Sequence, residues 1–150
     1  MRIFIDADAC PVKDEVYKVG ARYGLTTTVV SNSFIAIPPS KLIERMIVDA
    51  GPDVADDWIA ERCEPGDIVI TNDIPLADRV IKAEGAAIAP NGRPFSADSI
   101  GAALAQRSIM EHIRSMGEMT GGPKPFAAAD RSRFLQALDE AVNREKRRRR

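Results

Sequence analysis

Five short segments rich in β-branched and other apolar residues alternate with longer segments of helical spacing, and this alternation is the strongest constraint on the fold. The first helical segment places Val12, Val16 and Val19 on one face and stops at Gly24. Strands that alternate with helices are typical of a parallel sheet with helices on its faces. The expected strands are residues 2–5, 26–30, 45–49, 67–71 and 86–89.

The strand order follows if the chain winds outward through the first three strands and then crosses back to place the fourth beside the first. The sequence therefore predicts an α/β fold in three layers, with a mainly parallel sheet in the order 3-2-1-4-5. Residues 38–43 are expected to form a short helical turn. Two further helices, from Ser96 to about Met116 and from Asp130 onward, lack strands of their own and should pack on a sheet face or edge.

Length and composition indicate an ordinary soluble domain. The chain has 150 residues, 45% of them hydrophobic and 29% charged, which suits one domain spanning residues 1–143 and a basic tail at 144–150. No apolar run approaches the roughly 18 residues that a membrane span needs, and the chain opens on a strand instead of a leader. A cytoplasmic location is expected, with Cys10 and Cys63 reduced and Cys10 buried and inert.

Acidic residues follow the first and fourth expected strands. Asp6 and Asp8 are spaced two apart after the first strand, so an extended chain would point both to the same side. Asp73 follows the fourth strand in the same way. In the predicted order these two strands are neighbours, and the strand order reverses direction between them. Ligands of open parallel sheets bind beyond the carboxyl ends of the strands at such a reversal. The helix after the third strand starts at the same end with Asp56 and Asp57.

Converging carboxylates repel each other unless a cation neutralises them or one stays protonated. A hard cation such as Mg²⁺ takes oxygen ligands and can activate water against a phosphodiester. The sequence therefore predicts a metal site that draws on Asp6, Asp8, Asp73 and one or both of Asp56 and Asp57. A purely structural alternative stays open for Asp6 and Asp8, in which they end the first strand and cap the helix that Pro11 opens.

Several motifs in this sequence resemble the YaiI/YqxD family of uncharacterised bacterial proteins. The resemblance covers roughly residues 1–125, and Arg114 with Gly117 belongs to it. The motifs are Asp6-Ala-Asp8-Ala-Cys10-Pro11, Ile37-Pro38-Pro39-Ser40, Gly51 with Asp53-Val-Ala-Asp56, Gly66-Asp67, Ile70-Thr-Asn-Asp73-Ile-Pro75-Leu-Ala77 and Thr120-Gly121-Gly122-Pro123.

That family is similar to the PIN-like superfamily, whose better-known members are ribonucleases that depend on Mg²⁺ or Mn²⁺. The segment from Thr71 to Ala77 looks like the T-x-D-x-x-L-A element of those nucleases. The resemblance implies Asp6 and Asp73 as the first metal ligands and Asp8 and Asp56 as the next, with Asp57 able to replace Asp56. It implies catalysis by Asp6, Asp8 and Asp73, and hydrolysis of RNA.

Other polar residues are candidates for binding the substrate. Ser31 and Asn32 end the second strand, and Asn72 precedes Asp73. The Thr120-Gly121-Gly122-Pro123 loop is either a flexible turn or a backbone cradle for phosphate, with Arg114 and Lys124 as phosphate contacts. His112 is expected to be a surface or packing residue.

The charge distribution makes RNA a candidate partner. Residues 144–150 carry six basic residues and one acid, so the tail is +5 while the rest of the chain is −6. A basic tail can hold a polyanion, although a solvated helix end is the simpler reading. Two other functions stay open. One is a phosphohydrolase of the haloacid dehalogenase type that uses Asp6 and Asp8, and the other is a non-catalytic RNA- or protein-binding module. The oligomeric state is not predicted.

Overall fold

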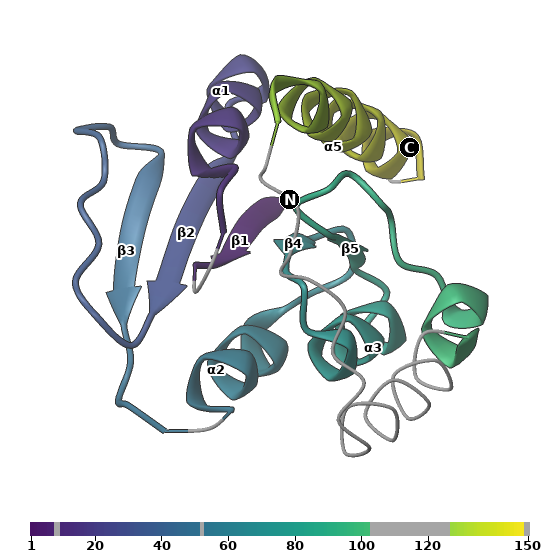
Figure 1. The fold of residues 1–150 in the computed structure, drawn as a ribbon, viewed down its shortest axis with the longest axis horizontal. Coiled ribbons are helices and arrows are strands. Elements are labelled where there is room, and N and C mark those ends of the chain that lie inside the picture. Colours follow the sequence, from purple (N-terminus) through teal and green to yellow (C-terminus); the bar gives the residue numbers. More distant parts are fainter. Residues whose placement is uncertain (8–9, 52, 103–126, 149–150) are drawn as a thin grey trace.

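The sheet has the strand order that the sequence predicts. The computed structural model describes residues 1–7, 10–51, 53–102 and 127–148, and these form a five-stranded sheet in the order β3-β2-β1-β4-β5 (Figure 1). Every neighbouring pair is parallel. The architecture is consistent with a PIN-like fold. The strands are β1 (Arg2–Asp6), β2 (Thr26–Ser31), β3 (Ile43–Ile47), β4 (Ile68–Ile70) and β5 (Ala86–Ile88).

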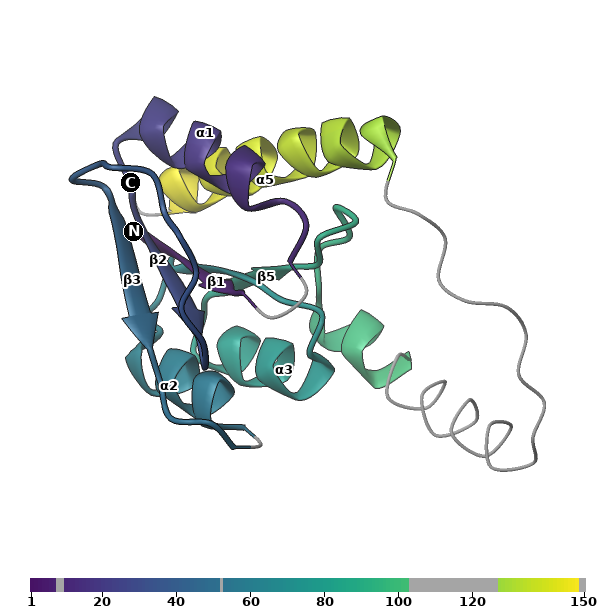
Figure 2. The ribbon, with the colours of Figure 1, turned by 60° about the vertical axis from the view of Figure 1, so that its left-hand side comes forward.

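Helices cover both faces of the sheet (Figure 2). Helices α1 (Lys13–Tyr23) and α5 (Ala128–Arg148) lie on one face, and α2 (Val54–Arg62) and α3 (Ile74–Lys82) lie on the other. Successive side chains of a strand point to opposite faces, so β1 contributes to both cores. Ile3 and Ile5 pack beneath α1 and α5, whereas Phe4 packs against α2 and α3. The three predicted layers are therefore confirmed.

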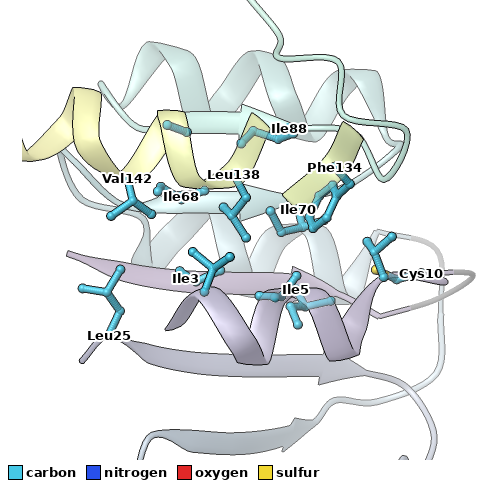
Figure 3. Close-up of a cluster of buried hydrophobic side chains, with 14 of the residues drawn as sticks. Ile3, Ile5, Cys10, Leu25, Ile68, Ile70, Ile88, Phe134, Leu138 and Val142 are labelled. Carbon is cyan, nitrogen blue, oxygen red and sulfur yellow. The ribbon is translucent and has the colours of Figure 1, made fainter. Parts of the chain in front are cut away.

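The core beneath α5 shows how the last helix is held (Figure 3). Phe134, Leu138 and Val142 recur at helical spacing, are fully buried and contact the sheet through the same cluster as Ile70. The prediction that this helix packs on a sheet face is confirmed. Cys10 belongs to the cluster at 5% exposure, and burial raises the pKa of its thiol, as expected of an inert buried cysteine.

The predicted helical turn over residues 38–43 is wrong. Ser40 Oγ accepts a hydrogen bond from the backbone N–H of Leu42 at 3.1 Å, which closes a turn, and Ile43 already pairs with Thr27 in the sheet. Strand β3 therefore begins at Ile43, two residues before the predicted start. Pairing with β2 satisfies the backbone groups that a helical turn would have left open.

The basic residues near the C-terminus belong to α5. This helix continues through residue 148, so the predicted domain boundary between residues 143 and 144 falls inside it. Glu145 is only 4% exposed and pairs with Arg148. Before α5, a helix begins at residue 97, where Ser96 and Ser99 exchange backbone-to-hydroxyl hydrogen bonds, and its predicted extent to Met116 lies outside the described residues.

None of the helices in the described ranges is long and apolar enough to cross a membrane.

Candidate functional site

The acidic site lies beyond the carboxyl ends of β1 and β4. These strands pair in parallel, with Ile5 opposite Ile70. Asp6 is the last residue of β1, and Asp73 lies three residues beyond the end of β4. Asp6 and Asp73 both line one cavity of about 320 Å³. The tertiary structure thus brings together two acids that are 67 residues apart in the chain, as the strand order requires.

Thr71 connects the two acids. Its Oγ1 donates a hydrogen bond to Asp6 Oδ2 at 2.8 Å and accepts one from the backbone N–H of Asp73 at 2.9 Å. Thr71 is 1% exposed, so water does not compete strongly for its hydroxyl. One buried side chain therefore fixes the Asp6 carboxylate relative to the backbone of Asp73.

Asp73 has a structural role and also faces the cavity. It is the N-cap of α3, with Oδ1 accepting a hydrogen bond from the backbone N–H of Leu76 at 2.8 Å. Pro75 lies in the first turn of that helix, where a missing N–H costs little. Asp73 therefore caps α3 and also forms part of the cavity wall.

Helix α2 presents only one of its two consecutive acids to the cavity. Asp56 lines it, whereas Asp57 is 55% exposed and pairs with Arg79 at 2.5 Å. Neighbouring helical residues point about 100° apart, so both could not face the same hollow. The structure therefore brings Asp56 together with Asp6 and Asp73, and it places Asp57 elsewhere.

The cavity wall is strongly acidic. Of its seven described lining residues, four are aspartates and none is basic. They are Asp6, Asn32, Gly51, Asp53, Ala55, Asp56 and Asp73. The pKa of Asp56 is raised to about 7, first because burial penalises its charged form and then because Asp73 and Asp6 repel that charge. A hydrogen bond with Asp73 also favours the protonated form. A cation in the cavity would relieve this repulsion.

The donor set fits a hydrated Mg²⁺ or Mn²⁺ better than a fully protein-ligated ion. Among the described residues, no group of three or more Asp, Glu, His or Cys side chains is arranged to hold one ion. Mg²⁺ commonly keeps several waters and binds proteins through one or two carboxylates. Asp6 and Asp73 would be such a pair if the cavity held the ion.

The other predicted site residues divide into three groups. Asn32 lines the cavity. Ser31 is fully buried, and its hydroxyl donates to the carbonyl of Ser33, while Asn72 is exposed and is not among the lining residues. The remaining predicted residues lie outside the described ranges: Asp8, Arg114, Thr120, Gly121, Gly122 and Lys124.

Sequence reasoning missed three contributors. Asp53 lines the cavity and adopts a left-handed backbone with φ of 66°. Gly51 also lines the cavity, and Thr71 positions the acids. The sequence carried a signal for all three, because each lies just after β3 or β4, at the same end of the sheet as Asp6.

The basic end of α5 lies at the opposite end of the sheet from the acidic cavity. Lys146 Nζ is 4.4 Å from the ring centroid of Tyr23, the last residue of α1 before β2 begins. Glu145 and Arg148 line a separate hollow with Gly66 and Glu84, which precede β4 and β5. A five-residue strand spans about 16 Å, so these basic side chains do not join the acidic cavity.

The raised pKa of Asp56 predicts how the stability of the metal-free protein depends on pH. The pKa of Asp56 is about 7 in the folded protein and ordinarily 3.8. Its favourable contribution to the free energy of unfolding is therefore complete below pH 3.8 and is lost as pH rises through 7. In EDTA at pH 8, Asp56→Asn should raise the free energy of unfolding by about 1 kcal/mol, a value reduced because solvent screens this partly buried group.

Thermal unfolding at pH 5 and pH 8 measures this effect. The variant should gain about 3 °C over wild type at pH 8 and about a third of that at pH 5, because the loss accumulates between pH 3.8 and 7. Asp57→Asn, which changes the neighbouring acid outside the cavity, is the matched control and should show no such difference. Equal responses of both variants would contradict repulsion within the cavity.

Comparison with known proteins identifies the chain's relatives. The family model described as "Uncharacterized BCR, YaiI/YqxD family" matches residues 4–144, which confirms the resemblance noted in the sequence and extends it through most of α5. A "UPF0178 protein" of Caulobacter vibrioides strain NA1000 is 72% identical over 145 residues, covering 97% of this chain and 95% of the relative. One from Rhodopseudomonas palustris strain TIE-1 is 60% identical, covering 99% of this chain and 94% of its own length. No solved structure matches the chain.

Proposed function

The chain belongs to the YaiI/YqxD family, and from its acidic cavity we propose that it is a divalent-metal-dependent nuclease that hydrolyses RNA phosphodiesters. The observation that carries the proposal is the convergence of Asp6 and Asp73, held by Thr71, at the carboxyl ends of adjacent parallel strands. Ligands of such sheets bind at this position. The family description assigns no activity, and the geometry of the cavity is what supports this function.

Each residue of the cavity that we name has a role in the proposed phosphodiester hydrolysis. Asp6 and Asp73 would hold Mg²⁺ or Mn²⁺, which supplies positive charge for a phosphate oxygen and acidifies a bound water. Without the cation the four aspartates would repel a phosphate, so binding of the substrate should require the metal. Thr71 keeps Asp6 oriented, and Asn32 can donate a hydrogen bond to the substrate from the cavity wall.

The described wall disfavours a phosphohydrolase with an aspartyl-phosphate intermediate. Such an enzyme needs a cation, commonly a lysine, to steady the phosphorylated carboxylate. None of the described lining residues is basic. A nuclease needs no covalent intermediate, so direct hydrolysis by water agrees better with this wall.

The test is cleavage of end-labelled single-stranded RNA by the purified protein. We expect cleavage with Mg²⁺ or Mn²⁺ and none in EDTA. If calorimetry shows that the protein binds Mn²⁺ but no RNA is cleaved, the result would instead support a non-catalytic RNA- or protein-binding module. Capture of beryllofluoride at Asp6, detected by mass measurement, would support the phosphohydrolase and contradict the nuclease.

A further inference from the structure

Strand β3 forms an edge of the sheet, and part of its backbone points away from β2. Among the described residues only β2 pairs with it (Figure 1). The backbone N–H of Val48 donates to the carbonyl of Ser31 at 2.8 Å, and residues of a parallel strand turn alternately toward a neighbour and away from it. Arg45 and Ile47 therefore direct their N–H and C=O groups outward, and no backbone bond in the described ranges satisfies them.

The large hydrophobic side chains that are exposed in the described part of the chain all lie at this edge. They are Phe34 at 69%, Ile47 at 49% and Met46 at 37% exposure. Proteins commonly protect an edge strand from pairing with proline, a bulge or outward charges. Strand β3 contains no proline, and its five residues pair with β2 in one unbroken register. Outward backbone groups beside exposed apolar side chains are typical of an interaction surface.

The two charged side chains of β3 are held within the molecule and do not protect its outer side. Thr28 Oγ1 donates to the Glu44 carboxylate at 3.5 Å. The guanidinium carbon of Arg45 lies 4.2 Å from the centroid of the Phe34 ring, and Arg45 Nη1 donates to the carbonyl of Ile35 at 3.1 Å. Both charges thus have partners on β2 or on the loop that precedes β3.

The residues of β3 restrict how a second copy can pair with it. Two copies related by a two-fold axis present the same edge to each other, and antiparallel pairing then sets one residue of β3 opposite itself. An axis at Glu44 or Arg45 would oppose two like charges, which is unfavourable. An axis at Met46 opposes two apolar side chains and sets Arg45 opposite Ile47 of the other copy. It also brings Asp49, two residues after Ile47, close to Arg45 of the other copy, and these charges attract.

We infer that β3 pairs antiparallel with β3 of a second copy about a two-fold axis at Met46, so that two sheets join into one. All strands of one copy are parallel, so those of the second copy run the opposite way. The two acidic cavities lie beyond the carboxyl ends of their strands and therefore open at opposite ends of the joined sheet. Each cavity acts by itself, and pairing of the copies is independent of the proposed function.

Disulfide cross-linking tests the pairing and its register. The two Met46 residues would form a non-hydrogen-bonded pair with Cα atoms about 4.5 Å apart, within the range that a disulfide spans. The two Glu44 residues would be about 14 Å apart, which is too far. After mild oxidation, Met46→Cys should run as a covalent dimer on a non-reducing gel, whereas Glu44→Cys should not. Wild type, which keeps Cys10 and Cys63, gives the background.

Sedimentation velocity over a wide range of protein concentrations tests the same contact without cysteine chemistry. Wild type should sediment as a dimer. Ile47→Lys, which sets a charge at the edge, and Ile47→Pro, which removes an outward N–H, should sediment as monomers with unchanged circular dichroism. Ala129→Lys adds the same charge at an exposed position of α5 and should remain a dimer.

The other outcomes would overturn the inference. They are a wild type that is monomeric at every concentration, a dimer that Ile47→Lys leaves intact, and cross-linking of Glu44→Cys in place of Met46→Cys. RNA cleavage by monomeric Ile47→Lys should equal that of wild type, because the cavities act separately. A dimer that cleaves no RNA would support the pairing and contradict only the nuclease.

Discussion

Replacing Asp6 by Asn is expected to reduce metal-dependent RNA cleavage by about 100-fold or more, because a metal site contributes several kcal/mol to the stabilisation of the transition state. Asn keeps the shape of the side chain and an oxygen that can accept the Thr71 hydrogen bond, so the fold should survive. The change removes one negative charge from the cavity. Single-turnover cleavage rates and Mn²⁺ calorimetry measure the two consequences, and both rate and affinity should fall.

Asp57→Asn is the matched control for this experiment. It makes the same chemical change on an acid that pairs with Arg79 and does not line the cavity. We expect its cleavage rate and its Mn²⁺ affinity to equal those of wild type. If Asp6→Asn and Asp57→Asn behave alike, the cavity is not the active site. If Asp6→Asn loses cleavage but keeps Mn²⁺ affinity, Asp6 is not a metal ligand.

Replacing Asp67 by Ala is expected to destabilise the protein by about 3 kcal/mol, the lower end for breaking a buried ion pair. The Asp67 side chain is 3% exposed and accepts hydrogen bonds from the backbone N–H and the guanidinium of Arg2 and from the backbone N–H of Glu64, each at 2.9 Å. Alanine would leave all three donors without this acceptor. The Arg2 side chain is 38% exposed, so water can solvate part of the guanidinium and limit the loss of stability in the variant.

Urea unfolding of Asp67→Ala beside Asp78→Ala measures this effect. Asp78 pairs with Lys82 one helical turn away on the surface of α3, and such exposed pairs contribute at most about 0.5 kcal/mol. The melting temperature of Asp67→Ala should fall by about 10 °C and that of the control by less than about 2 °C. Similar losses in the two variants would show that the Arg2–Asp67 contact does not tie the start of β1 to the start of β4.

Much of the fold could be predicted because local patterns in this chain agree with its tertiary structure. The β-branched run of β2 indicates a strand, and the helical spacing of α1 with the left-handed Gly24 at its end indicates a helix. Predicted boundaries of elements were wrong where a side-chain hydrogen bond sets them. At Ser40 the hydroxyl closes a turn, and β3 starts at Ile43. Residue propensities alone do not show whether residues 38–43 form a helical turn or a tight turn that leads into β3.

Sequence alone determined that acids follow β1 and β4 and that these strands should be neighbours, since alternating strands and helices restrict the topology. Only the tertiary structure decided that Asp56, and not Asp57, faces the cavity, because that choice depends on the rotation of α2 against the sheet. Tertiary structure also placed the basic end of α5 away from the acids, since a helix packed across the whole sheet face carries its last turn to the far end. The sequence determines which acids are present, whereas the packing of helices on the sheet determines which of them lie close together.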